Sequence, residues 1–414
     1  MPSPAEDPVA HASYLHHSLA LGLREEVVAG LHAALKVSNR RSWLAIVQFA
    51  CAAPQPPDGY LERHRESPVL CTTCPGPLPD GQCVGVSDGG YAFTDELGPV
   101  SEGIKALNDR VTQGKTPYAT IALMLPMTPA GDSKADRAQL LREVQGAYLA
   151  QYRANEVDKE DVPIRLVLAN PGRDLNHGIQ VANWLDEMAR FPKDRLRVVF
   201  GFNLSVKPTA DTISYLTRQK GIPVVGGPIT ATDLANDQSN RYPGLVKVVP
   251  SHLDQAHALQ RYLKVDDDKT FLIEDLNGDD LYSRSLRTAF REVTKGAASG
   301  PEQYDSSRVT NGDFKQMVNS VCNSKAPTLY FAGRPHALAQ LINALGDRGC
   351  TDRPLRVVTV SGASTIALEP DLNWGVFTRG GGLPAAHHEV LQVGAGVCGE
   401  GGGPVGHEPR VVAA

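Results

Sequence analysis

The sequence predicts an α/β fold of two doubly wound parallel-sheet lobes joined by a hinge, with the second lobe incomplete. Three observations predict it. From Tyr118 onward, short runs rich in Val, Ile and Leu alternate with amphipathic stretches of helical length. The short runs are almost continuously apolar, which is typical of parallel strands covered on both faces. The chain of 414 residues is long enough for two or three compact domains.

The first lobe is expected at residues 115–250. Its predicted helices carry apolar residues at three- and four-residue spacing, and its predicted strands lie between them. The expected strands are 119–125, 164–168, 196–200 and 222–225, and the expected helices are 136–155, 177–190 and 210–220.

The second lobe is expected at residues 251–374, and the two lobes are expected to meet near Pro250. A strand at 246–249 is grouped with this second set of elements. The other expected strands are 270–273, 328–331 and 356–360, and the expected helices are 253–263, 281–294, 312–323 and 337–345.

The two ends of the chain have a different character. Residues 1–114 include a stretch rich in Pro, Gly and Cys and are interpreted as a leader, linker or anchor region with little core of its own. Of the last 40 residues, 11 are Gly, so residues 375–414 are expected to form a disordered tail without strands. Either the tail is natural, or the reading frame departs near Trp374 and leaves a truncated protein.

The cysteines allow more than one interpretation. A C-x-x-C pair ends at Cys74, and Cys83 follows nine residues later. A zinc site would need a fourth ligand and only His64 is near, so a disulfide between Cys74 and Cys83 is favoured and no metal is expected. Cys322 and Cys350 flank a predicted strand and helix at a spacing compatible with a second disulfide, or with two buried thiols.

Composition and motifs argue against several function classes. The net charge is −5 and acidic and basic residues are interspersed, so nucleic acid is not an expected partner. The phosphate-binding G-x-G-x-x-G is missing after the first strand, and neither a G-x-x-x-x-G-K-[ST] loop nor a G-x-S-x-G elbow occurs. We therefore expect neither a catalytic site nor a cofactor.

The loops after the predicted strands are the expected binding region, because ligands of open parallel sheets bind beyond the carboxyl ends of the strands. These loops are small, polar and rich in Gly, as close approach of backbone N–H groups to a ligand requires. They are residues 126–132, 201–205, 226–233, 274–282 and 332–336.

Five segments in this order resemble the branched-chain amino acid binding branch of the type I periplasmic binding proteins. They are residues 121–128, 199–205, 222–234, 272–282 and 329–336, and the resemblance covers residues 118–374. It implies that hydroxyl and backbone N–H groups of the first lobe hold the ligand and that the second lobe closes over it. The implied ligand-binding residues are Thr128, Ser205, Thr230 and Thr232 on the first lobe and Asn277, Asp279, Tyr282 and Arg334 on the second.

Some residues depart from the family pattern or have another interpretation. Thr230 and Thr232 are equally suited to capping the next helix. The family holds an amino acid ammonium with an aromatic and an acidic residue, but Asp279 and Ala337 stand at those positions. An amino acid ligand would therefore need a substitute carboxylate from Asp275, Asp279 or Asp280.

The resemblance implies an extracytoplasmic receptor that captures a small polar solute, amino-acid-like or amide-like, in an interlobe cleft. The expected partner is a membrane permease of the ABC type, and the receptor is expected to be tethered to the cell membrane. The alternatives are a ligand-sensing domain of a membrane-associated signalling system and a non-catalytic truncated product.

Overall fold

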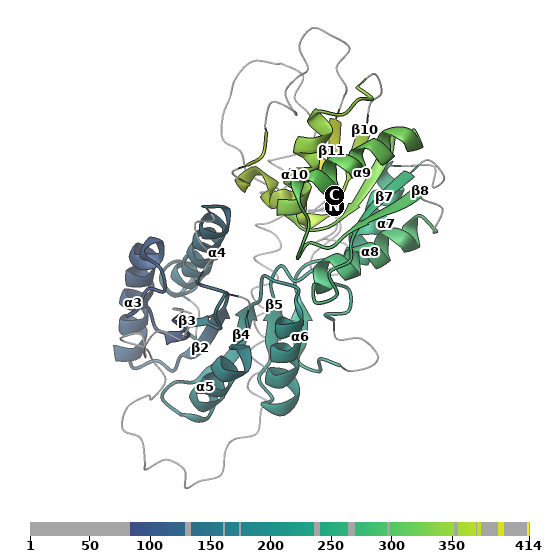
Figure 1. Ribbon diagram of the computed structural model, residues 1–414. Coiled ribbons are helices and arrows are strands. Elements are labelled where there is room, and N and C mark those ends of the chain that lie inside the picture. The colour runs from purple at the N-terminus through teal and green to yellow at the C-terminus, as the bar shows by residue number, and fades with distance from the viewer. Residues whose placement is uncertain are drawn as a thin grey trace. The chain divides into compact units, whose positions relative to one another are not determined.

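The computed structural model describes residues 83–128, 134–159, 162–173, 175–235, 241–263, 270–295, 299–351, 355–369, 371–373, 388–392 and 412–413. They form two compact units. The first unit contains the described residues up to 229 and residues 234–249, and the second contains 230–233 and the described residues from 250 onward. Each unit is built on its own six-stranded sheet (Figure 1). The expected α/β class with parallel sheets is confirmed.

The sheet of the first unit has the strand order β1-β3-β2-β4-β5-β6. All its neighbours pair in parallel except β1, which is antiparallel to β3. The central strand β3 is buried at every position, because its run of apolar side chains meets helices on both faces. The strands are β1 (Gly85–Ser87), β2 (Ala119–Met124), β3 (Ile164–Asn170), β4 (Leu196–Gly201), β5 (Val224–Gly226) and β6 (Leu245–Lys247).

Helices cover both faces of this first sheet (Figure 1). Helix α3 places Val100, Ile104 and Leu107 on one face, and the first two join a core cluster with Leu123 of β2 and Leu166 of β3. The helical elements are η1 (Asp95–Leu97), α3 (Gly98–Gln113), α4 (Lys134–Tyr152) with its extension η2 (Arg153–Val157), α5 (Gly178–Arg190), and α6 (Lys207–Ser214) with its extension η3 (Tyr215–Gln219).

The sheet of the second unit has the order β12-β11-β10-β9-β7-β8 and is parallel throughout. Two of its helices, α8 (Leu281–Val293) and α9 (Asn311–Ser324), begin at side-chain caps. Asp280 caps α8 by accepting a hydrogen bond from the N–H of Tyr282, and Thr310 and Asp313 form a capping box at the start of α9. The strands are β7 (Thr270–Asp275), β8 (Ser299–Tyr304), β9 (Thr328–Ala332), β10 (Leu355–Val358), β11 (His388–Gln392) and β12 (Val412–Ala413).

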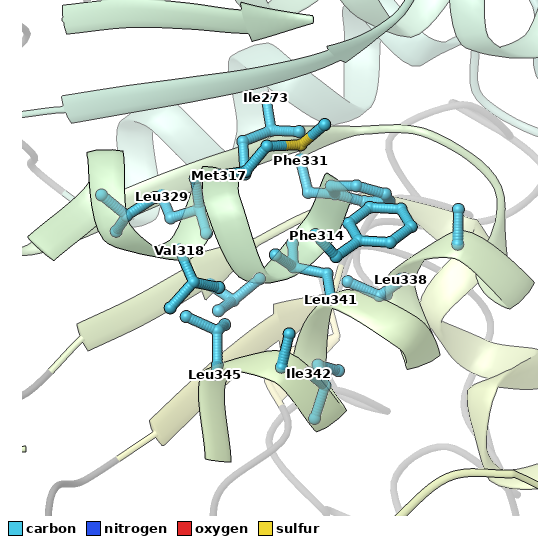
Figure 2. Packing of buried hydrophobic residues seen from close by; sticks show 14 of the residues in the cluster. Ile273, Phe314, Met317, Val318, Leu329, Phe331, Leu338, Leu341, Ile342 and Leu345 are labelled. Carbon is cyan, nitrogen blue, oxygen red and sulfur yellow. The ribbon is translucent and has the colours of Figure 1, made fainter. Parts of the chain in front are cut away.

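Two core clusters hold the second unit together. Residues of α9 (Asn311–Ser324) and α10 (Pro335–Gly346), among them Phe314 and Leu341, pack with Phe331 of β9 (Figure 2). A second cluster joins α7 (His252–Leu263) and α8 (Leu281–Val293) to Leu272 of β7 and Tyr330 of β9. A short 3-10 helix, η5 (Ser361–Leu368), follows β10. Alternate residues of β7 and β9 enter different clusters, as expected for a sheet buried on both faces.

Two expected assignments are wrong. Residues 83–114 are not a region without core, because β1 pairs with β3 and α3 is packed into the first unit. The strand at 246–249 lies within the expected bounds of the first lobe, but it was grouped with the elements of the second; it belongs to the first sheet, where β6 pairs with β5. Both errors have the same cause: β1 and β6 are only three residues long, so tertiary pairing rather than local pattern decides where they belong.

Three strands of the second sheet were not expected. Strand β8 has the polar sequence Ser-Gly-Pro-Glu-Gln-Tyr and is largely exposed, as an edge strand can be. Strands β11 and β12 contradict the expectation that no strand follows Trp374, because β11 pairs with β10 and β12 pairs with β11. The free edge of β10 offers backbone hydrogen bonds even to a segment whose composition is poor for a core. The rest of the expected tail lies outside the described residues.

The cysteines of the described part are in disulfides. Cys322 and Cys350 are bonded to each other with a Cα–Cα distance of 5.6 Å, which links the end of α9 to the segment after α10. Cys83 is also disulfide-bonded, but Cys74 and the other remaining cysteines lie outside the described residues. Among the helices that the structure describes, none has the length and apolar composition required to cross a bilayer.

Candidate functional site

The carboxyl ends of the parallel strands are where binding residues are expected, and each unit has one such edge. In the first unit, β2, β4 and β5 are adjacent, so the loops that follow them start side by side. In the second unit the same holds for β8, β7, β9 and β10. We describe the two edges separately and call them the first edge and the second edge.

Backbone hydrogen bonds fix the strand ends at the first edge. The N–H of Phe202 donates to the carbonyl of Met124 at 2.8 Å, and the N–H of Gly227 donates to the carbonyl of Gly201 at 2.6 Å. Gly201 has a φ of +111°, and a Cβ there would lie 2.6 Å from the Met124 carbonyl oxygen. Only glycine therefore allows β4 to turn this close to β2.

Asn170, the last residue of β3, organises the first edge and was not predicted. Its Oδ1 accepts hydrogen bonds from the N–H groups of Met127 (2.8 Å) and Gly172 (3.1 Å), and its Nδ2 donates to the carbonyl of Cys83 (2.6 Å). The side chain is fully buried, so these bonds replace the water that it loses. The sequence did contain a signal for this role, because Asn170 directly follows a run of apolar residues at the end of a predicted strand.

Thr128 and Ser205 lie in neighbouring loops of the first edge. Thr128 follows β2, and Ser205 follows β4, which pairs with β2. Ser205 is buried and lies two residues before α6, whose N-cap residue Val206 makes no side-chain capping bond. Each hydroxyl has one donor and two acceptor positions, so it can bind a polar ligand group in addition to a protein partner.

Thr230 and Thr232 pack with the second unit, not with Ser205 on the first. The Thr230 hydroxyl is 2.7 Å from Nε2 of His252, and the carbonyl of Thr230 accepts from the N–H of His252 at 2.8 Å. The Thr232 hydroxyl accepts from the N–H of Leu253 at 3.3 Å, in the first turn of α7. The capping alternative therefore describes the contact of Thr232, and the grouping of both residues with the first lobe is wrong.

An ion pair occupies the centre of the second edge. Arg334, which follows β9, donates from Nε to Oδ2 of Asp280 (2.9 Å) and from Nη2 to Oδ1 (2.6 Å). Asp280 also accepts from the N–H of Tyr282 and the hydroxyl of Ser283. All four acceptor positions of this buried carboxylate are thus used, and its charge is matched by the guanidinium.

Tyr282 connects this ion pair to the residues around it. The guanidinium carbon of Arg334 lies 5.1 Å from the ring centroid, and the ring of His252 meets the tyrosine ring edge-on at 4.5 Å. Its hydroxyl accepts from the N–H of Gly362 at 3.1 Å. Burial raises the pKa of Tyr282 to about 12, so the phenol is neutral at physiological pH.

The loop after β7 contains the remaining predicted residues. Asp275, the last residue of β7, is fully buried and accepts from the N–H groups of Asn277 and Ser306 and from the Ser283 hydroxyl. The Asn277 side chain donates to Ser306 at 3.2 Å. Asp279 is exposed. The second edge therefore brings together Asn277, Tyr282 and Arg334 with Asp275 and Asp280, while Asp279 points into solvent.

Both edges are suited to hydrogen bonding. Among the residues that the structure describes, no group of three or more His, Cys, Asp or Glu is placed to hold a metal ion. The side chains at the two edges include hydroxyls, amides, a phenol and an ion pair, groups that can orient a polar ligand by hydrogen bonds.

The decisive comparison is with known protein families. A family model described as periplasmic binding protein matches residues 121–378. The chain belongs to the periplasmic binding protein family. The match begins in β2 and ends beyond η5, so it includes the predicted site residues of both units. The resemblance to type I periplasmic binding proteins that the sequence indicated is confirmed.

Solved structures of the same kind are also similar. An ABC transporter substrate-binding protein from Desulfitobacterium hafniense is 17% identical with a TM-score of 0.44, and the match covers 58% of this chain and 66% of that one. The structure of a substrate-binding protein from the same organism in complex with Leu is 16% identical with a TM-score of 0.45, covering 60% and 68%. This periplasmic binding protein thus spans about two thirds of their length. Comparison with curated protein sequences finds no match.

Proposed function

We propose that the protein is a non-catalytic receptor, tethered to the outer face of the cell membrane, that captures a small polar solute and delivers it to an ABC-type permease. The solute is amino-acid-like or amide-like. The single observation that carries the proposal is the convergence of polar residues at the two edges of a periplasmic binding protein, with Thr128 and Ser205 on neighbouring strand ends of the first unit.

The disulfide supports the location. Cys322 and Cys350 are bonded, and disulfides persist in oxidising compartments outside the cytoplasm. The bond links the end of α9 to the segment that follows α10, and both helices pack in the second unit's core, which is typical of a structural disulfide. An exported receptor meets this condition.

The first edge supports capture of a polar group. Thr128 and Ser205 offer hydroxyls at neighbouring strand ends, and Val206, the N-cap residue of α6, makes no side-chain capping hydrogen bond. Hydroxyl and N–H donors bind a carboxylate or a carbonyl oxygen without placing a second charge beside it. We propose that these groups hold the oxygen atoms of the solute.

The second edge supports an amide-like rather than an ammonium-bearing solute. Asp280 is committed to Arg334, Asp275 accepts three protein hydrogen bonds, and Asp279 is exposed. A buried ammonium without a free carboxylate is costly, because the desolvation of the charge is not compensated.

A ligand screen on the whole chain tests the proposal. Small polar metabolites are screened by thermal shift, and each compound that stabilises the protein is measured by calorimetry on the wild type and on a variant with Thr128→Ala and Ser205→Ala. We expect the double variant to lose about 10-fold to 100-fold in affinity, since two hydrogen bonds to the solute are removed.

The matched control is Thr112→Ala, which removes a hydroxyl that donates to the Asn108 carbonyl inside α3. It should leave the affinity unchanged. Unchanged affinity in the double variant, or a screen without a single stabilising compound, contradicts the proposal. Copurification with a permease supports delivery, whereas copurification with a membrane signalling protein indicates a sensor.

A further inference from the structure

A buried tyrosine at the second edge has a hydroxyl that no protein group satisfies. Tyr304 is the last residue of β8 and is 5% exposed. Its ring packs against Phe314 and Phe331 in the core. Within the part of the chain that the structure describes, its fully buried Oη makes no hydrogen bond. Such an atom is uncommon in a folded protein and calls for a partner that the protein chain does not supply.

The hydroxyl lies beside the loop that follows β9. A Cβ built on Gly333 would lie 2.0 Å from Tyr304 Oη, so the hydroxyl takes the space of a side chain at position 333. Tyr282 has a parallel arrangement, since a Cβ on Gly362 would lie 2.3 Å from its Oη. The difference is that the N–H of Gly362 satisfies Tyr282, while Tyr304 has no equivalent donor.

The charges around Tyr304 balance. The carboxylates of Asp275 and Asp280 are its charged neighbours, and both raise its pKa further above the usual value after burial has raised it. Asp280 is paired with Arg334, and the Asp275 carboxylate accepts hydrogen bonds from the N–H groups of Asn277 and Ser306 and from the Ser283 hydroxyl. Both carboxylates thus have their partners within the protein, and the phenol beside them is neutral.

We infer that Tyr304 is a specificity-determining residue, whose hydroxyl binds an uncharged polar group of the solute, such as an amide or a hydroxyl group. The inference rests on the proposed function. An anionic group would be repelled by Asp275 and Asp280, and a cationic one would find Asp280 paired with Arg334 and Asp275 already accepting three hydrogen bonds. A neutral group can form a hydrogen bond with the phenol without charge repulsion and without the desolvation of an unpaired cation. Residue 333 carries no side chain that would stand between the hydroxyl and such a group.

The test uses matched probes and the full chain. Primary amides from acetamide to valeramide are offered with the carboxylate and the alkylammonium of the same length, and binding is measured by calorimetry. We expect the amides to bind most tightly. Tyr304→Phe should weaken amide binding about 3-fold to 10-fold, the loss expected for one neutral hydrogen bond. It should leave the melting temperature without ligand unchanged or higher, because an unsatisfied buried hydroxyl is removed.

The control variant is Tyr215→Phe, which removes a hydroxyl that donates to Asn183 at 2.7 Å in the first unit. It should lower the melting temperature slightly and leave amide affinity unchanged. A lower melting temperature with unchanged affinity in Tyr304→Phe would mean a structural hydroxyl and overturn the inference. So would tighter binding of the carboxylates or the alkylammonium ions. If amide binding depends on Ser205 but not on Tyr304, the inference about Tyr304 is wrong and the proposed function stands. If none of the probes binds, both the inference and the proposed function are wrong.

Discussion

Removing the Cys322–Cys350 disulfide should destabilise the second unit specifically. The two cysteines are 28 residues apart, and chain-entropy arguments give about 3.5 kcal/mol of stabilisation for a loop of that size. Both side chains are only half-buried, so replacing them with serine removes little packing. The double variant Cys322→Ser with Cys350→Ser should therefore lose about 3 to 4 kcal/mol of unfolding free energy.

Urea unfolding of the whole chain followed by circular dichroism measures this loss. Chemical reduction of the wild type is a weaker test, since it also opens the disulfide of Cys83. In the double variant only the transition of the second unit should move, because α9 and α10 pack in that unit's core. A loss below about 1 kcal/mol, or an equal shift of both units, would refute the loop-closure reasoning.

Two further predictions concern single residues. Gly333→Ala should destabilise the second unit by about 1 to 3 kcal/mol in urea unfolding, because the new Cβ meets Tyr304 Oη and Phe331 Cζ, which lies 2.7 Å away. Gly146→Ala, in α4 with no atom within 4 Å of its Cβ, is the control and should stabilise by up to about 1 kcal/mol; equal effects would contradict the packing argument. Burial raises the pKa of Glu143, so its contribution to stability is greatest below the unfolded pKa and is lost as pH rises through the folded pKa. Thermal unfolding from pH 4 to pH 8 should therefore favour Glu143→Gln over the wild type increasingly with pH, and parallel profiles would argue against this.

Much of the fold was predictable because its fully buried strands can be identified from their own apolar sequences. Strands β3, β7 and β9 are buried along their whole length, so their apolar runs mark them regardless of their neighbours. Strands β1 and β8 could not be found in the same way, and β6 was found but grouped with the wrong sheet. Strands β1 and β6 are three residues long and β8 is a polar edge, so the backbone pairing rather than the side chains decides where each belongs.

The candidate site was predictable in position but less so in its contacts. The carboxyl-end rule located the loops that contain Ser205, Tyr282 and Arg334. It could not show that Arg334 is paired with Asp280, since 54 residues separate them in the chain. It also missed Tyr304, because the strand that ends there was not recognised.

The two buried tyrosines of the second edge have opposite effects on the stability of the empty protein. Tyr282 has a hydrogen-bond donor in Gly362 and a stacked guanidinium in Arg334, so its hydroxyl adds to the stability of the loops after β9 and β10. Tyr304 has neither, and an unsatisfied buried hydroxyl costs about 1 to 3 kcal/mol. Phenylalanine would fill the same core space between Phe314 and Phe331 without that cost. The inferred hydrogen bond between the Tyr304 hydroxyl and the solute would offset this cost in the bound protein, whereas the empty protein bears it in full.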